Sequence, residues 1–259
     1  MAPGGAAKTP GFQGENVQHT NGQTGLARKT GNRLLDRLPD EEWQQVVSQL
    51  EEVDMPLGMK LSESDAPVEL VYFPTAGAIS TVATTSAGES VEVYLAGREG
   101  FSGVAALFNL PEMAHGVVVQ VAGRGYRMRA SSFRNLVHTL KAFRELIYRT
   151  IYLRMVLATQ SVLCNRLHEV EQRLARWLLT LADRVESEQV QVTQEYIAEM
   201  LGARRSTVTV AAGALQDRGL ISYSRGKVTI LDRPGTIAAA CECYETVAAA
   251  HRRIWGVMR

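Results

Sequence analysis

Residues Thr193 to Arg218 are TQEYIAEMLGARRSTVTVAAGALQDR, a pattern of two short helices joined by a tight turn. Apolar residues recur at helical spacing on both sides of Gly202. The helices of a helix-turn-helix cross steeply, so the crossing favours small or apolar residues and the turn favours glycine. Ala198 and Val208 meet this requirement. The second helix begins with residue types that contact phosphates and base edges, namely Arg204, Arg205, Ser206 and Thr207. The stretch therefore predicts a DNA-binding motif.

The composition limits the other possibilities. The chain has 259 residues, enough for two domains of about 100–200 residues each. Its formal net charge is only +1, so any contact with DNA must come from a local patch rather than from a basic surface as a whole. No uninterrupted apolar run approaches the length of a membrane span, so we expect no contact with a membrane.

The three cysteines, Cys164, Cys241 and Cys243, are too few and too unevenly spaced for a disulfide framework. Free thiols are typical of a reducing compartment, and we expect a cytoplasmic protein. Residues 1–30 are rich in Gly, Gln, Asn and Thr and lack the apolar core of a signal peptide. We expect them to form a disordered tail.

Between the tail and the motif, the pattern changes twice. Residues 33–54 have helical periodicity. Residues 68–129 contain short β-branched or aromatic runs separated by turn clusters, which predicts a β-sandwich, roll or barrel. Residues 131–166 return to helical periodicity. Four of them follow the alternating four-and-three spacing of a coiled-coil seam: Leu136, Leu140, Phe143 and Ile147.

Such a helix would be about 45 Å long, which favours a spine between two subunits; the alternative is a helix packed on its own domain. Residues 169–186 predict a further amphipathic helix. After the motif, the runs 220–223 and 227–230 flank Ser224, Arg225 and Gly226, which predicts a short hairpin, or wing. Residues 236–259 predict one more helix.

This order of elements, from about Asn32 to Tyr244, resembles the Crp/Fnr superfamily of bacterial transcription regulators. The resemblance rests on GREG at Gly97–Gly100 and on the winged-helix segment that ends in GLISYSRGKVTILD. It implies an α+β fold with a disordered tail at 1–30 and a jelly-roll-like, double-stranded β-helix sensor domain at 31–135, of the cyclic-nucleotide-binding kind. A dimerisation helix at 136–166 and a winged helix-turn-helix domain at 167–259 would follow.

The resemblance also implies the partners. These are a second copy of the chain, a palindromic operator with half-sites about one helical turn apart, and RNA polymerase if the protein is an activator. The alternative is a small-molecule sensor whose β-roll binds an unidentified ligand.

By match to the family motif, Arg205 and Ser206 occupy the main base-reading positions. Arg205 suits guanine, whereas Ser206 stands where many members carry a more selective glutamate. Val210 stands where some members carry a second base-reading arginine, and valine cannot donate. Arg204, where a short capping residue would be expected, suggests a phosphate contact. Further candidate phosphate contacts are Thr193, Thr207, Thr209, Arg225 and Lys227, with a solvated surface as the alternative.

The sensor region departs from the members that bind cyclic nucleotides. Those members hold the ribose with a glutamate and the cyclic phosphate with an arginine; the matching residues here are Val104 and His115. An apolar side chain cannot bind a hydroxyl, and an unperturbed histidine is mostly neutral at pH 7. We therefore expect no tight binding of a cyclic nucleotide. The cavity would bind another ligand or, as we favour, be filled by side chains such as Phe101, Leu107 and Phe108.

No cofactor, metal or catalytic residue is expected. An iron–sulfur cluster needs several clustered cysteines. The segment from Cys241 to Cys243 offers half of a metal site, but no second ligand pair is evident in the sequence, so a packed or solvated helix is favoured. A haem ligand or a metal-dependent enzyme on a jelly-roll scaffold would have to rely on His115, the one histidine of the β region.

Overall fold

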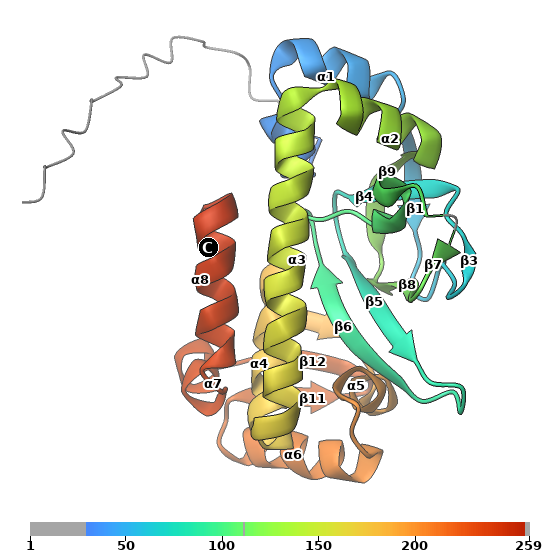
Figure 1. The fold of residues 1–259 in the computed structure, drawn as a ribbon. Helices are drawn as coiled ribbons and strands as arrows, with labels where there is room; N and C mark the ends of the chain where they lie inside the picture. Colours follow the sequence, from blue (N-terminus) through green and yellow to red (C-terminus); the bar gives the residue numbers. More distant parts are fainter. Residues whose placement is uncertain (1–29, 111, 257–259) are drawn as a thin grey trace, which may run out of the picture.

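The structure, a computed structural model, describes residues 30–110 and 112–256 (Figure 1). Apart from Thr30, the tail expected at 1–30 lies outside the described residues. The β domain lies beside the upper part of a long helix, α3 (Lys141–Leu167), the helical domain lies around the lower end of α3, and α8 (Cys243–Trp255) runs beside α3 on the side away from the β domain. The chain therefore has a mixed fold with an N-terminal β domain and a C-terminal helix-turn-helix, as the sequence predicted.

The β domain is built from antiparallel strands in three sheets. The strands are β1 (Glu51–Met55), β2 (Lys60–Ser62), β3 (Ala66–Pro67), β4 (Leu70–Pro74), β5 (Ala78–Thr84), β6 (Ser90–Ala96), β7 (Glu112–Met113), β8 (Gly116–Val121) and β9 (Gly123–Arg129). Their orders are β1-β9-β4, β2-β8-β5-β6 and β3-β7. The β5–β6 pair forms a hairpin from Ile79↔Ala96 to Thr84↔Ser90 and extends toward the C-terminal domain (Figure 1).

Short helices close the β domain. They are η1 (Leu35–Arg37), α1 (Asp40–Val47), η2 (Val104–Phe108) and α2 (Ala130–Thr139). The prediction of helix over 33–54 is correct only as far as Val47, where α1 ends. From Glu51 the chain pairs with β9 and becomes a strand, because hydrogen bonds to a distant neighbour override the local helical pattern.

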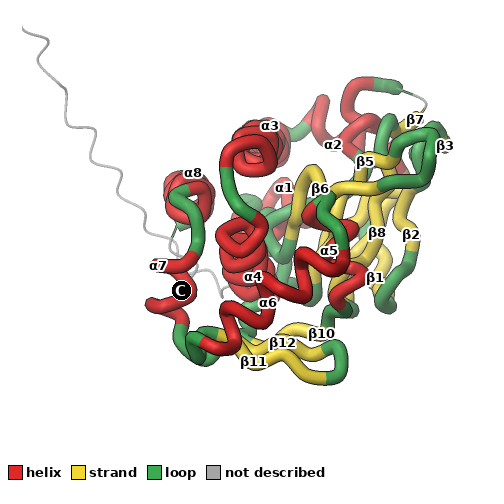
Figure 2. The backbone as a smooth tube through the Cα atoms, turned by 90° about the horizontal axis from the view of Figure 1, so that it is seen from below, coloured by secondary structure: helices red, strands yellow, loops and turns green. Residues whose placement is uncertain are grey.

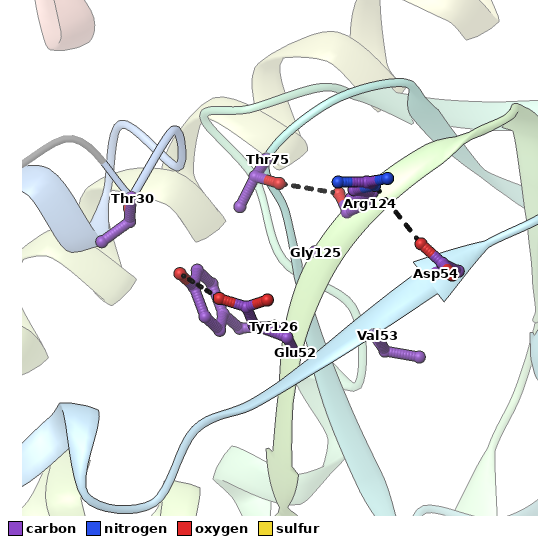
Figure 3. A pocket seen from close by; sticks show the side chains of 8 residues that line it. All are labelled: Thr30, Glu52, Val53, Asp54, Thr75, Arg124, Gly125 and Tyr126. Carbon is purple, nitrogen blue, oxygen red and sulfur yellow. Dashed lines mark hydrogen bonds and ion pairs between the residues drawn. The ribbon is translucent and has the colours of Figure 1, made fainter.

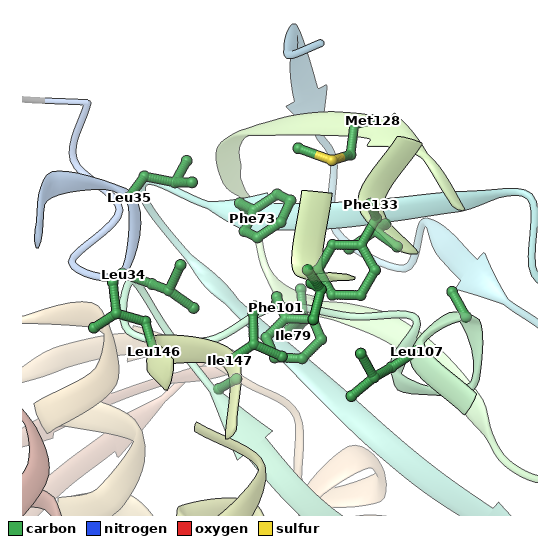
Figure 4. Close-up of a cluster of buried hydrophobic side chains, with 14 of the residues drawn as sticks. Leu34, Leu35, Phe73, Ile79, Phe101, Leu107, Met128, Phe133, Leu146 and Ile147 are labelled. Carbon is green, nitrogen blue, oxygen red and sulfur yellow. The ribbon is translucent and has the colours of Figure 1, made fainter. Parts of the chain in front are cut away.

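Aromatic rings fill the centre of the β domain (Figure 4). Phe73, Phe101, Phe133 and Phe143 are all buried, and their ring centroids lie 5.5–6.5 Å apart where they pair. Phe101 and Leu107 are thus inside, as expected. Phe108, which we expected beside them, is 59% exposed at the end of η2, so its predicted position is wrong.

The predicted spine is two helices rather than one. Leu140 has extended dihedrals (φ −98°, ψ 118°) and separates α2 from α3, so α3 begins at Lys141 instead of 136 and is about 40 Å long. The predicted seam of Leu136, Leu140, Phe143 and Ile147 lies entirely in the core of its own domain. These residues therefore cannot form the contact between subunits, and the predicted coiled-coil seam is wrong.

The C-terminal domain packs around α4 (Val170–Val185). It contains β10 (Gln189–Gln191), α5 (Gln194–Leu201), α6 (Arg205–Asp217), β11 (Ile221–Ser224), β12 (Lys227–Ile230), α7 (Arg233–Ala239) and α8. The helix predicted over 236–259 is instead α7 and α8, because Ala240 is extended (φ −75°, ψ 159°). Trp255, the last residue of α8, returns to the N-terminal core, and α8 lies beside α3 in both views (Figures 1 and 2).

The two domains share buried surface. Ala78, Val82 and Leu95 of the β5–β6 sheet belong to the same apolar cluster as Trp177 of α4 and Leu201 of α5. In the part of the chain that the structure describes, no helix has the length and apolar character needed to cross a membrane.

Candidate nucleic-acid interface

The helix-turn-helix consists of α5 and α6. The Thr193 hydroxyl caps α5 by accepting a hydrogen bond from the Tyr196 amide at 3.2 Å. Gly202 ends α5 with a left-handed conformation (φ +57°), which a residue without a Cβ adopts at low cost. The Ala203 amide then donates to the Ala198 carbonyl at 2.9 Å. The sequence pattern of small residues around a glycine turn is confirmed.

One face of each helix is buried. The apolar residues that carry the helical pattern all lie in the core of the C-terminal domain: Ile197, Ala198, Leu201, Val208, Ala211, Ala212 and Leu215. Burial of this face fixes the orientation of α6 and turns the residues at its start outward. Arg204, Arg205, Ser206 and Thr207 are all exposed.

The start of α6 is open to an anionic ligand. Arg204 is the N-cap residue and makes no side-chain capping bond among the described residues, as the sequence suggested. The first amides of a helix are unpaired and carry partial positive charge, which favours a phosphate. Arg205 Nη1 lies 3.4 Å from Glu195 Oε2, but both side chains are mostly exposed, at 66% and 73%. Such a pair is weak, so the guanidinium remains available to DNA.

A hollow of about 280 Å³ brings the motif and the wing (Ile221–Ile230) together. Its lining includes three predicted contact residues: Thr193, Arg205 and Arg225. Arg225, at the tip of the wing, has a positive φ of +50°. Lys227 is exposed on β12 of the same hairpin.

Two of the predicted phosphate contacts already hydrogen-bond within the motif. The Thr209 hydroxyl lies 2.8 Å from Gln194 Oε1 and 3.0 Å from the Arg205 carbonyl, and its one proton can be donated to either acceptor. Among the described residues, the Thr193 hydroxyl is only an acceptor, so its proton is available to a phosphate. A contact from Thr209 would require its hydroxyl to give up these internal bonds.

The two candidate ligand residues of the β domain lie in different surroundings. Val104, on η2, is partly buried and packs on the apolar core. His115 is exposed in the turn before β8. One side chain faces the core and the other faces solvent, so they do not form a shared ligand site.

A polar hollow of about 440 Å³ lies on the surface of the β domain (Figure 3). Arg124 pairs with Asp54 at 3.4 Å, and the Tyr126 hydroxyl donates to Glu52 at 3.4 Å. These groups satisfy one another. The hollow lies over β1 and β9 rather than inside the roll, so it is distinct from the expected sensor cavity.

The β5–β6 hairpin lies against the helix-turn-helix, which sequence reasoning missed. A groove of about 690 Å³ separates the hairpin tip from α5 and the start of α6, and Arg204 and Arg205 are part of its wall. Within the hairpin, the partly buried Glu92 on β6 accepts hydrogen bonds from Ser80 at 2.7 Å and from Trp177 Nε1 at 3.1 Å. Burial raises the pKa of the Glu92 carboxyl, against the opposing effect of these bonds and of nearby arginines.

The GREG turn makes a second contact between the domains. Glu99 is buried and lies 3.1 Å from Arg184 Nε on α4. Arg98 and Arg33 both pair with Glu186, the residue that ends α4, at 2.8 and 2.7 Å. A Cβ on Gly97 would lie 2.5 Å from the Arg184 carbonyl oxygen, so only glycine permits this approach. The sequence marked GREG as a turn, but nothing local pointed to its partners on α4.

Comparison with known proteins agrees with this architecture. Residues 172–235 match the family model of the Crp-like helix-turn-helix domain. No curated protein is significantly similar to the sequence.

Solved structures share the fold at low sequence identity. The c-di-GMP responsive global regulator CLP of Xanthomonas campestris is 16% identical with a TM-score of 0.63, covering 75% of this chain and 100% of its own. A CRP/FNR-family transcriptional regulator from Thermus thermophilus is 20% identical with a TM-score of 0.60, covering 73% and 98%. FixK2 from Bradyrhizobium japonicum is 16% identical with a TM-score of 0.60, covering 74% and 98%.

Proposed function

We propose that the chain is a transcription regulator of the Crp/Fnr family, and that it binds a palindromic operator as a homodimer without control by a cyclic nucleotide. The observation that carries the DNA-binding part is the hollow where Arg205 of α6 lies beside Arg225 of the wing. In a winged helix-turn-helix, the second helix enters the major groove and the flanking residues contact the backbone.

Arg205 is the main base reader in this proposal. Its exposed guanidinium can donate two hydrogen bonds to guanine O6 and N7, a contact that discriminates against other bases by about 1–3 kcal/mol. Ser206 adds a less selective contact, and Val210, 73% exposed, offers only methyl groups. Specificity within each half-site therefore depends mostly on one arginine.

The outer face of α3 supports the homodimer. It carries an exposed apolar stripe, here named the outer stripe, of Tyr148, Tyr152, Met155, Val162, Leu163 and Leu167. Tyr148, Tyr152 and Met155 follow the four-and-three spacing of a coiled-coil seam. Their exposed fractions are 53%, 57% and 63%, and exposed apolar patches of this kind mark protein interfaces. Pairing of two outer stripes would place two copies of α6 about a two-fold axis, as a palindrome requires.

The interior of the β domain supports the absence of cyclic-nucleotide control. Phe73, Phe101 and Phe133 occupy its centre, and the residues that match the nucleotide-binding positions are an apolar Val104 and an exposed His115. Calorimetry with cyclic AMP and cyclic GMP tests this part of the proposal. Micromolar affinity for either nucleotide would contradict it.

The DNA-binding part is tested by selecting sequences from random double-stranded DNA with the purified full-length protein. We expect a palindrome whose half-sites contain a guanine at a fixed position and lie about one helical turn apart. Enrichment of a single asymmetric site would contradict the two-fold arrangement. Binding without any sequence enrichment would contradict the assignment of Arg205.

A further inference from the structure

Four side chains able to bind a metal converge where α3 ends. Cys164 lies in the last turn of α3 and His168 directly follows that helix, whereas Cys241 lies between α7 and α8 and Cys243 is the first residue of α8. One ligand atom of each lies within 4.8 Å of the others. We propose that these four residues, here named the Cys3His cluster, bind one zinc ion that fixes the joint between α3 and α4.

The separations of the ligand atoms suit a single tetrahedral ion. Cys164 Sγ lies 3.5 Å from Cys241 Sγ, and Cys243 Sγ lies 3.5 Å from His168 Nδ1. Zinc bonds of about 2.3 Å to sulfur and about 2.0–2.1 Å to nitrogen give tetrahedral edges of about 3.8 Å between sulfurs and about 3.5 Å from sulfur to nitrogen. The four residues are therefore already at nearly the spacing that zinc requires.

The sequence shows why these atoms meet. Cys164 and His168 are four residues apart, so they lie on one face of the helix, and the His168 amide still donates to the Cys164 carbonyl at 3.2 Å. On the other side, Ala240 is extended and the Tyr244 amide donates to the Cys241 carbonyl at 3.1 Å, which turns the chain into α8. The sequence marked only the pair from Cys241 to Cys243. Its partners are more than 70 residues earlier in the chain, which is why the second ligand pair was not evident.

Neighbouring groups orient the ligands. His168 Nε2 lies 3.1 Å from Glu242 Oε1, so the imidazole can donate to the carboxylate while Nδ1 faces the sulfurs. Gln160 Nε2 donates to Cys243 Sγ at 3.0 Å. A carboxylate on the far nitrogen of the histidine and an amide donor on a sulfur are typical of the surroundings of zinc sites.

The charges near the Cys3His cluster favour thiolates. Arg173 and Arg176, on α4, are 7% and 9% exposed and interact electrostatically with Cys164. The Nε atoms of both are buried and have no hydrogen-bond partner among the described residues. Three thiolates, a neutral histidine and a divalent ion carry a net charge of −1, which would offset part of this buried positive charge. Neutral thiols would leave it uncompensated.

The location of the Cys3His cluster defines its role. Only His168 and Glu169 separate α3, which carries the outer stripe, from α4 of the DNA-binding domain. An ion held by His168 and Cys164 on one side and by Cys241 and Cys243 on the other ties α7 and α8 to this joint. Because the His168 side chain is 12% exposed, the cluster also has a route to solvent.

The test is cobalt and zinc binding by the reduced full-length protein. We expect about one zinc ion per chain by elemental analysis, and cobalt(II) should give thiolate charge-transfer bands with the visible absorption of tetrahedral coordination. Zinc should displace the cobalt and raise the melting temperature by about 5 °C or more, since it binds only the folded cluster.

Three variants locate the ion. The double variant Cys241→Ser/Cys243→Ser should lose the cobalt bands and the stoichiometric zinc. His168→Cys should keep zinc and shift the cobalt spectrum toward four thiolates. His138→Gln, at an exposed histidine on α2 outside the cluster, is the matched control and should behave as the unaltered chain does.

Four results would overturn the proposal. The first is the absence of cobalt–thiolate bands in the reduced, unaltered chain, a measurement that does not depend on whether a variant folds. The second is equal zinc content in the double variant. The third is iron–sulfur absorption in the isolated protein, and the fourth is a disulfide between Cys164 and Cys241 that persists under reducing conditions.

Discussion

The Glu99 carboxylate lies 3.1 Å from the Nε of Arg184, and both side chains are almost completely buried, at 1% and 3% exposed. Glu99 also accepts a hydrogen bond from the Gly97 amide at 3.2 Å. Through this pair, the turn after β6 holds the end of α4, so a charged contact inside the molecule links the β domain to the DNA-binding domain.

Loss of this pair should be costly. We expect Glu99→Ala to lower the free energy of unfolding by about 3–5 kcal/mol, because it leaves the Arg184 charge buried without its carboxylate. Arg98→Ala removes a more exposed pair with Glu186 in the same turn and should cost about 1 kcal/mol or less. Urea unfolding of both variants measures the difference. Equal losses of unfolding free energy in the two variants would show that the buried pair of Glu99 stabilises the fold no more than the exposed pair of Arg98 does.

Arg205 should determine sequence preference. We expect Arg205→Ala to reduce discrimination at one operator position by about 1–3 kcal/mol and to leave part of the non-specific binding. Lys227→Ala, which would remove a phosphate contact, should weaken binding to all sequences similarly and reduce its salt dependence. Gel-shift titrations at fixed salt, with the selected operator and single-base variants, separate the two effects. Unchanged specificity in Arg205→Ala would refute its assignment.

The outer stripe should hold the subunits together. We expect the double variant Tyr152→Glu/Met155→Glu to be monomeric, because two charges per subunit would have to be buried without partners at the interface. Leu57→Glu, at a 62% exposed leucine between β1 and β2, places one carboxylate outside the stripe and serves as the control. Light scattering coupled to size-exclusion chromatography measures the masses. A double variant that remains dimeric would place the interface elsewhere.

The contact between the β5–β6 hairpin and α4 should depend on pH through Glu92. Burial raises the pKa of this carboxyl, so its contribution to stability is complete below the unfolded pKa of about 4.3 and is lost as pH rises through the folded value. We expect Glu92→Gln to remove this loss, because its amide oxygen can accept from Trp177 Nε1 while its amide nitrogen donates to the Ser80 hydroxyl. The free energy of unfolding of Glu92→Gln, measured with urea relative to the unaltered chain, should therefore increase with pH. Glu89→Gln at the exposed hairpin tip is the control, and an equal pH-dependent gain there would contradict the role of Glu92.

The features that could be predicted from the sequence are those with a local cause. The buried faces of α5 and α6, the turn at Gly202 and the uncapped Arg204 all follow from spacing within a few residues. Phe143 and Ile147 also have a regular spacing, but spacing alone cannot tell whether a helix face meets its own domain or a second subunit.

Contacts between residues far apart in the chain have no such pattern in the local sequence. Glu51 joins a strand because β9 lies beside it, Glu99 meets Arg184 across two domains, and Cys164 meets Cys241 only after α8 folds back along α3. In each case, tertiary contacts determine the environment, whereas the sequence reports only neighbours along the chain.

The close approach at Gly97 has an evolutionary consequence. The carbonyl of Arg184 occupies the space where any side chain at this position would begin. A descendant chain that replaces the glycine must either end α4 earlier or move it away from the turn. Among relatives of this protein, the residue at this position and the length of that helix should therefore change together, as a pair of linked inherited characters.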